Sequence, residues 1–192
     1  MPTPNQAALD FLLTRRSRPA KTLQAPAPSR EELAPILTAA ARTPDHGKLE
    51  PWRFIVIETG AMARLADLTE KHARAAGLPD EKIEKQRQQF DQGHLAVAVI
   101  EVRRETKALP AIEQTYSTGA VCLALLNAAL ASGWGANWLS GFPAHNRSFT
   151  EEAFGLAENE SVAGYIHIAT ETRIPPERPR PDMESITTWL ST

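Results

Sequence analysis

Apolar residues at helical spacing predict two helices near the start of the chain. The first covers residues 5–14, where apolar side chains recur three and four positions apart after Asn5, a residue type that favours the N-cap. The second opens at Ser29, because Glu32 three positions later completes a capping box. Pro35 lies inside that helix and removes one backbone donor, so we expect a kink there or a later start.

Two strongly apolar segments predict the central strands of a sheet. Residues 52–58 are rich in β-branched and aromatic side chains, and a helix over 61–76 follows them, with Gly77 at its end. Residues 94–102 predict a second strand, whose apolar run has too little polarity for one solvated face. We therefore expect the sheet to be covered on both sides.

Residues 80–169 predict a charged segment, a long apolar helix and three shorter elements. Residues 80–92 are highly charged and form either a solvated helix or a mobile excursion. Residues 112–132 are the longest helix candidate, apolar almost all round in the second half, and should form the spine of the core. A short strand over 134–139, a helix opened by Ser148 and a strand over 162–169 complete the pattern.

The end of the chain is rich in proline and then in isolated apolar residues. Four prolines between positions 175 and 181 exclude regular helix and sheet, and the apolar residues beyond them have no room for a core of their own. These apolar residues are Met183, Ile186, Trp189 and Leu190. We expect residues 171–192 to form an arm that docks on its own domain or on a partner chain. Because there is no internal repeat and no linker, residues 1–192 predict a single domain.

Composition and charge exclude several classes of protein. The chain has 192 residues, and its 21 basic and 23 acidic side chains leave a net charge of −2, so no global field attracts nucleic acid or an anionic membrane. Cys122 is the single cysteine, so we expect no disulfide and no metal site, as in a protein of the reducing cytoplasm. No signal peptide is visible, and the apolar segment 119–131 is too short to span a bilayer.

Three segments carry candidate chemistry, and the first is Arg15, Arg16 and Ser17. Two permanent cations and a hydroxyl after a helix can hold a phosphate monoester by charge-assisted hydrogen bonds, each worth roughly 1.5 to 3 kcal/mol. The ordinary alternative is that cations at a helix C-terminus stabilise the helix macrodipole.

The second segment is a polar loop ahead of the strand at 52–58. Thr43 precedes a proline, which disfavours the α region and so ends the preceding helix. The loop places Arg42 and His46 four residues apart. The alternative for His46 is a loop histidine that bonds to nearby backbone.

The third segment is Leu139, Ser140 and Gly141, which follows the expected short strand. Gly141 has no Cβ, so its backbone can approach a planar ring closely. The alternative is that the glycines here form turns and that the neighbouring tryptophans belong to the core.

In this order, the three segments resemble the flavin-binding signature of the nitroreductase family, in particular its small single-domain members. The resemblance implies that Arg15, Arg16 and Ser17 hold the phosphate and ribityl chain of FMN. It also implies that Arg42 and His46 reach the flavin of the other subunit.

The same resemblance extends to the ring and to the nicotinamide. Leu139, Ser140 and Gly141 match the family loop that runs along the flavin ring. Lys48 and Glu50 stand where most members of the family have asparagine and glutamine. The residues assigned to nicotinamide binding in similar proteins are here Ala129, Leu130, Ala131, Ser132, Gly133 and Trp134.

The resemblance also implies a fold and an activity. The fold is an α+β, nitroreductase-like α/β/α sandwich with a mixed central sheet flanked by helices, in a homodimer with FMN at the interface and residues 171–192 docked on the partner. The activity is transfer of hydride from NADH or NADPH through flavin N5 to a small conjugated acceptor, a nitroaromatic or a quinone. No side chain acts as a nucleophile. Because no dinucleotide fingerprint or Walker loop occurs, the nicotinamide would bind only transiently.

Two other functions stay open from the sequence. The first is an FMN-binding dimeric scaffold or sensor with little turnover, since the same residues would hold the cofactor. The second is a helical interaction domain without a cofactor, which only the charged segment 80–92 favours.

Overall fold

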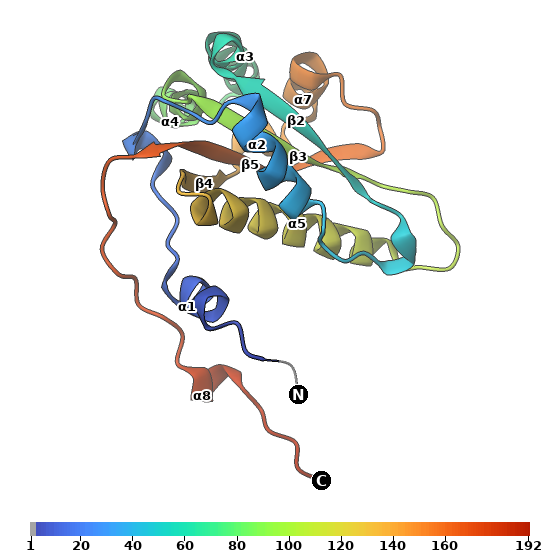
Figure 1. The fold of residues 1–192 in the computed structure, drawn as a ribbon. Coiled ribbons are helices and arrows are strands. Elements are labelled where there is room, and N and C mark those ends of the chain that lie inside the picture. The colour runs from blue at the N-terminus through green and yellow to red at the C-terminus, as the bar shows by residue number, and fades with distance from the viewer. Residues whose placement is uncertain (1–2) are drawn as a thin grey trace.

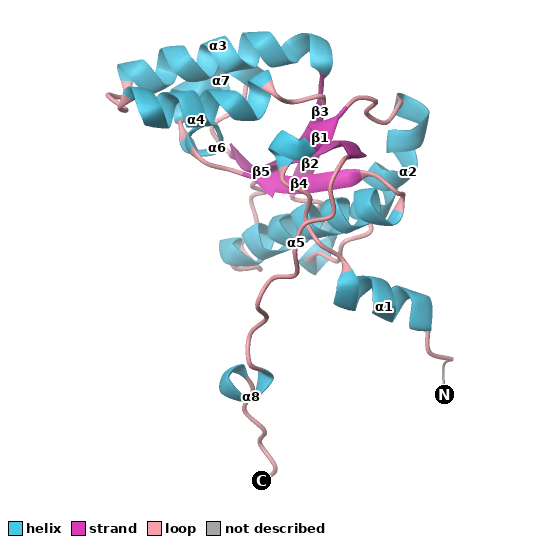
Figure 2. Ribbon diagram, turned by 90° about the vertical axis from the view of Figure 1, so that its left-hand side faces the viewer, coloured by secondary structure: helices cyan, strands magenta, loops and turns pink. Residues whose placement is uncertain are grey.

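Strand β5 (Glu160–Glu171) organises the sheet because it pairs with three other strands. The computed structural model describes residues 3–192, and its five-stranded sheet has the order β1-β5-β3-β2, with β4 also paired to β5. The strands are labelled in Figures 1 and 2, β1 only in Figure 2. The other strands are β1 (Leu23–Gln24), β2 (Trp52–Glu58), β3 (Leu95–Val102) and β4 (Gly135–Leu139).

All strand pairs within the described residues are antiparallel, so the mixed sheet implied by the resemblance must be corrected, while the α+β class is confirmed. Between β2 and β3 lie two helices, α3 (Thr59–Ala75) and α4 (Asp80–Asp91), and they return the chain to the end where β2 finishes, because Glu58 pairs with Leu95. Strand β5 lies between β3 and β4 and runs opposite to both. No two neighbouring strands therefore run in the same direction.

Helices cover both faces of the sheet (Figures 1 and 2). One face carries α2 (Arg30–Ala40) and α5 (Ala111–Ala131), and the other carries α3, α4, α6 (Phe142–His145) and α7 (Arg147–Phe154). Side chains of β3 alternate between these two layers, which is why all eight of its residues are buried. The buried strand and the long core helix that the apolar runs predict are confirmed. Within residues 3–192, no helix is both long enough and apolar enough to span a membrane.

Capping residues decide where two of the helices begin. The capping box of Ser29 and Glu32 is present in full, and α2 runs from its first turn through Pro35, so the later start considered for this helix is wrong. The seventh helix starts before the predicted position, because Asn146 and not Ser148 is its N-cap.

The charged segment 80–92 is a helix, the first of its two predicted alternatives. Two residues of α4, Ile83 and Phe90, are buried, and the ring of Phe90 lies 5.5 Å from that of Tyr165 on β5, centroid to centroid. Phe90 anchors the helix on the sheet, and α4 also packs along α3, to which Arg87 forms two ion pairs.

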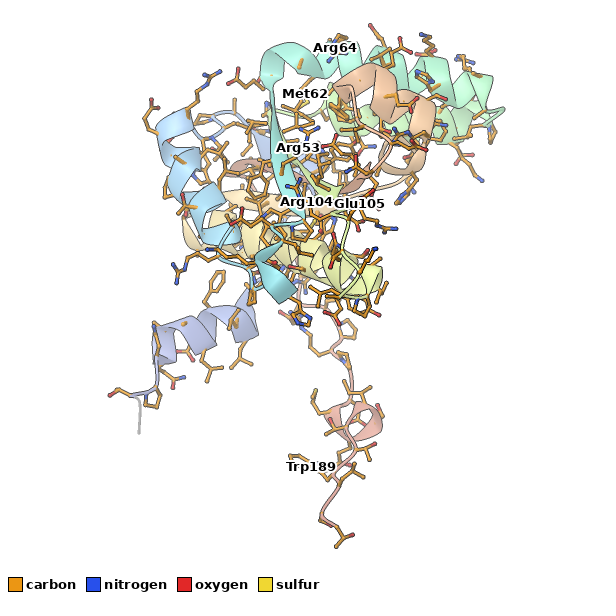
Figure 3. All side chains as sticks on the ribbon, turned by 90° about the vertical axis from the view of Figure 1, so that its right-hand side faces the viewer. Arg53, Met62, Arg64, Arg104, Glu105 and Trp189 are labelled. Carbon is orange, nitrogen blue, oxygen red and sulfur yellow. The ribbon has the colours of Figure 1, made fainter. Side chains whose placement is uncertain are left out.

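Both ends of the chain extend beyond the α5 layer (Figures 1 and 2). No residue of α1 (Gln6–Thr14) is buried, and Leu13 is 67% exposed. The C-terminal arm contains the short helix α8 (Met183–Ile186), and Trp189 near its end lies away from the body (Figure 3) and is 89% exposed. The apolar part of the arm therefore does not dock on its own domain.

Candidate functional site

Arg15, Arg16 and Ser17 follow α1 directly and lie beside β4. The backbone N–H of Arg18 donates to the carbonyl oxygen of Ala136 at 2.8 Å and attaches this segment to the start of β4. Because β4 leads into the turn at residues 139–141, this bond brings the first and third predicted segments to the same edge of the sheet.

Arginine side chains are concentrated at this junction. One guanidinium nitrogen of Arg15, Nη2, donates to the Ser17 hydroxyl at 3.1 Å, whereas the buried Nε has no hydrogen-bond partner within residues 3–192. Burial lowers the pKa of the Arg15 guanidinium, and the positive charges of Arg180, Arg16 and Arg18 lower its pKa further. Burial and three neighbouring positive charges thus both disfavour the Arg15 cation, which favours an anion at this place. Arg180 belongs to the C-terminal arm and was not predicted from the sequence.

Carboxylates balance only part of this charge. Arg16 pairs with Glu177 at 3.1 Å, and Arg18 pairs with Glu171. Arg15 forms no ion pair within the described part of the chain, and its side chain donates to no carbonyl of α1. A buried donor of a permanent cation is therefore left for a ligand to satisfy.

The turn after β4 has a backbone that only glycine adopts readily. Gly141 has φ 101° and ψ −159°, and an added Cβ would lie 2.5 Å from Oε1 of Gln86. That same oxygen accepts a hydrogen bond from the Phe142 N–H at 3.0 Å. The turn formed by Ser140 and Gly141 is thus held from the side of α4.

A cavity of about 250 Å³ opens between β4, α4 and the 3₁₀ helix η1 (Ala20–Thr22). Leu139 lies in its wall, together with residues that no sequence motif indicates. Two lysines and several amides dominate this set, which is Pro19, Ala20, Lys21, Lys85, Gln88, Gln89, Gln92, Asn137 and Leu139. The sequence signal for them is the polar stripe of α4, whose members recur three and four positions apart, a pattern that by itself indicates a solvated face.

The loop that contains Arg42 and His46 packs against the start of α5 instead. The 3₁₀ helix η2 (His46–Lys48) brings the His46 ring to Glu113, with Nδ1 2.5 Å from Oε2, so this histidine bonds to a side chain rather than to nearby backbone. The Ser117 hydroxyl donates to a carbonyl oxygen of the same loop at 2.7 Å.

This loop holds an unusual backbone. The φ angles of Gly47, Lys48 and Glu50 are 76°, 55° and 47°, and for the two residues that carry a Cβ this region is strained. The Asp45 carboxylate accepts a hydrogen bond from the Leu49 N–H at 2.5 Å and fixes the turn. Strain that surrounding bonds maintain is typical of functional loops.

The predicted site residues therefore form two groups at opposite ends of α5. The first and third segments lie at the C-terminal end of the helix, together with residues 129–134. Arg42 and His46 lie at its N-terminal end. The helix from Ser117 to Ala129 spans about 18 Å, so one chain does not bring the two groups together.

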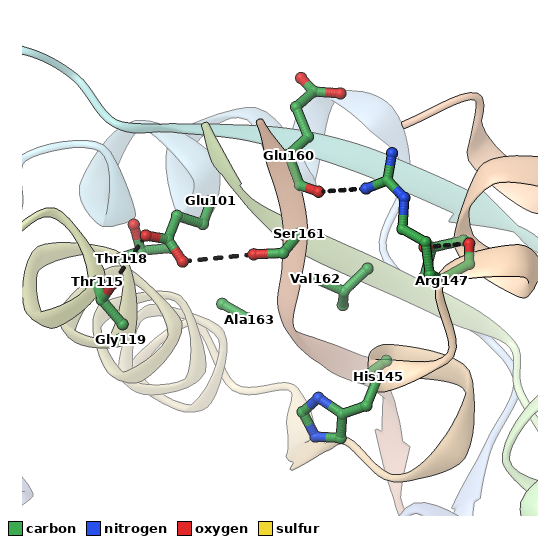
Figure 4. Close-up of a pocket in the computed structure, with 12 residues that line it drawn as sticks. Glu101, Thr115, Thr118, Gly119, His145, Arg147, Glu160, Ser161, Val162 and Ala163 are labelled. Carbon is green, nitrogen blue, oxygen red and sulfur yellow. Dashed lines mark hydrogen bonds between the residues drawn. The ribbon is translucent and has the colours of Figure 1, made fainter. Parts of the chain in front are cut away.

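A second cavity, of about 420 Å³, lies beside the part of β5 that β4 does not reach (Figure 4). Glu101 in its wall accepts hydrogen bonds from the hydroxyls of Thr115, at 2.8 Å, and Ser161, at 3.4 Å. The Arg147 guanidinium donates to the carbonyl oxygen of Glu160 at 2.9 Å. These polar groups bond to one another, and no predicted site residue lines this cavity, so it is not the candidate site. Residues 3–192 contain no cluster of three or more His, Cys, Asp or Glu side chains that could hold a metal ion.

Comparisons with known proteins point to one family. The model of the nitroreductase family matches residues 12–170. A curated protein of Escherichia coli (strain K12), named Putative NAD(P)H nitroreductase YdjA, is 37% identical over 163 residues, which cover 85% of this chain and 87% of that protein.

Two crystal structures share the fold. A nitroreductase-like family protein from Bacillus cereus has a TM-score of 0.79 at 20% identity, over 100% of both chains. A mutant of the FMN and NADPH-dependent nitroreductase NfnB from Sphigopyxis sp. strain HMH has a TM-score of 0.77 at 16% identity, over 96% of this chain and 99% of that chain. At these identities the two structures support the architecture alone.

Replacing Gly141 with alanine should destabilise the protein by about 3 kcal/mol, because the backbone is strained for any residue with a Cβ and the methyl group would meet Gln86. Gly155→Ala is the matched control, since Gly155 has φ 64° and open space around a Cβ, and should cost only about 1 kcal/mol. Urea denaturation of both variants measures the difference. Equal losses of unfolding free energy would contradict the restraint on the turn.

Proposed function

Because the chain belongs to the nitroreductase family, we propose that it is an FMN-dependent oxidoreductase that transfers hydride from NADH or NADPH to a small conjugated acceptor, a nitroaromatic or a quinone. The observation that carries the proposal is the buried Nε of Arg15, which has no partner within residues 3–192, in an arginine segment that leads directly into the cavity wall at Pro19. The names of relatives support it, since YdjA is described as an NAD(P)H enzyme and NfnB as dependent on FMN and NADPH. When bound, FMN supplies the redox chemistry at ring nitrogen N5.

Arg15, Arg16 and Ser17 are our assignment for the phosphate and ribityl chain. The guanidinium of Arg15 offers a planar set of donors, and the Ser17 hydroxyl that it already orients lies 3.1 Å away. A phosphate at this place would satisfy the buried Nε and reduce the repulsion among the neighbouring arginines. Both effects favour a phosphorylated ligand over one without a phosphate.

The cavity beside Leu139 is our assignment for the flavin ring. Leu139 lines this cavity and supplies an apolar contact, and the turn formed by Ser140 and Gly141 follows Leu139 directly. Lys21 and Lys85 line the same cavity, and their positive charges would stabilise the negative charge that the ring gains on reduction. No side chain needs to act as a nucleophile.

The turn that ends α5 is our assignment for the nicotinamide. Ala131, Ser132 and Gly133 are exposed there and lie next to the start of β4. They leave room for a dinucleotide to approach the ring from solvent. Since the sequence has no dinucleotide-binding fingerprint, this contact would be transient.

A homodimer would complete the site. Ile112, Tyr116 and Leu123 form an exposed apolar stripe on α5, with 50%, 68% and 45% of each residue accessible. In a two-fold dimer that pairs these stripes in opposite directions, the start of one α5 meets the end of the other. Arg42 and His46 of one subunit would then reach the flavin of its partner.

The C-terminal arm, residues 171–192, would dock on the partner subunit in such a dimer. Its apolar side chains are exposed within one chain, Trp189 by 89% and Leu190 by 91%. Burying them on a second copy would gain the hydrophobic free energy that the isolated chain forgoes.

Rapid anaerobic mixing of the FMN-loaded protein with NADPH or NADH tests the proposed activity. We expect the visible flavin absorbance to bleach within seconds with at least one nucleotide, and to return when a quinone is added. If neither nucleotide bleaches the bound flavin, the enzyme assignment is wrong and the scaffold or sensor with little turnover is favoured.

The dimer is tested by placing a charge on the α5 stripe. The wild type should have the mass of two chains in solution, and Leu123→Asp should give monomers that bind FMN weakly, because the partner contacts are lost. Ala75→Asp is the matched control, at an exposed position at the end of α3 in the opposite helical layer. Light scattering measures the mass, and circular dichroism checks the fold. A folded L123D protein that stays dimeric would contradict this interface.

A further inference from the structure

Gln86 joins α4 to the turn that follows β4. Its side-chain oxygen accepts a hydrogen bond from the Phe142 N–H at 3.0 Å. The same oxygen lies 2.5 Å from the place of a Cβ on Gly141, so it is in contact with the turn itself. One side chain therefore restrains both residues that follow Ser140.

The backbone of Gln86 is itself held firmly in place. Its neighbour Arg87 forms ion pairs with Asp67 and Glu70 of α3, at 2.8 Å and 2.7 Å. Phe90, one turn further along, is fully buried against the sheet. Arg87 thus holds α4 to α3, and Phe90 holds it to the sheet. The hydrogen bond from Phe142 to the Gln86 side chain therefore restrains the turn relative to a fixed helix.

The turn carries free hydrogen-bond donors beside the cavity. The backbone N–H groups of Ser140 and Gly141 have no acceptor within residues 3–192, while the next N–H, that of Phe142, is occupied by Gln86. Leu139, directly before them, lines the cavity assigned to the ring. Two solvent-accessible donors without an acceptor in the described part of the chain, next in sequence to a residue that lines the cavity, are suited to stabilise negative charge on a ligand bound there.

We propose that Gln86 is a positioning residue that holds the turn at Ser140 and Gly141 so that their backbone N–H groups face the cofactor ring. This inference rests on the proposed function, because it requires FMN in the cavity. Donors fixed in advance stabilise charge better than donors that must reorganise when the charge appears. Gln86 therefore sets the reduction potential of the bound FMN, without touching the ring.

The test is the two-electron midpoint potential of the FMN-loaded dimer, measured for the wild type and for Gln86→Leu. Loss of the acceptor frees the Phe142 N–H and relaxes the turn, so we expect the equilibrium constant for reduction to fall at least tenfold, which is about 30 mV. Gln86→Met keeps the length of the side chain without the acceptor and should show the same fall if the leucine variant loses FMN. Lys82→Leu is the matched control on the same helix, because Lys82 is exposed and does not line the cavity, and its potential should equal that of the wild type.

Three results would overturn the role of Gln86, and only the last would also overturn the proposed function. An unchanged potential in FMN-loaded Q86L or Q86M, even with a lower melting temperature, would overturn the positioning role and leave the proposed oxidoreductase in place. A fall of the same size in K82L would also overturn it, because the effect would then belong to α4 in general. A wild type that binds no FMN would overturn the proposed function and this assignment with it.

Discussion

The burial of an arginine donor that has no partner in the described part of the chain is the constraint on which the site depends. Arg15, Arg16, Arg18 and Arg180 gather where α1 meets β4, and the carboxylates nearby balance only part of their charge. Placing a cation in a partly buried position without a partner is unfavourable, so this arrangement is stable chiefly when an anion occupies it. The single backbone bond from Arg18 to Ala136 then ties the anion site to the strand that carries the ring contacts. The position of the bound anion would thus determine where the rest of the ligand lies relative to β4.

The length of α5 sets the second constraint. The helix separates the loop of Arg42 and His46 from the arginine cluster by about 18 Å, and the loop is fixed to the helix by Ser117 and Glu113. Within one chain the two groups therefore lie apart. In a two-fold dimer, the loop of one chain would lie near the arginine cluster of the other. The exposed apolar stripe on α5 and the C-terminal arm are the surfaces that the second copy would cover.

Periodicity and capping predicted most of the elements, because both depend on local sequence. The uniform apolar run of β3 and the capping box at Ser29 are examples. The order of the strands could not be predicted, since the pairing of β5 with both β3 and β4 depends on contacts distant in sequence. Sequence motifs indicated the arginine segment, the loop of Arg42 and His46 and the turn at Gly141 as candidate site residues. They missed Lys85 and Gln86, because polar residues on a charged helix look like a solvated face until the opposite wall is known.

The most direct measurement compares the affinity of the protein for FMN with its affinity for riboflavin, which lacks the phosphate. If the arginine cluster holds the phosphate by two or more charged hydrogen bonds, FMN should bind at least about 100-fold more tightly. The double variant Arg15→Ala, Arg16→Ala should lose most of this preference. Arg30→Ala, which removes an exposed arginine that pairs with Glu58, should keep it. Equal affinity of the wild type for the two compounds would contradict the account.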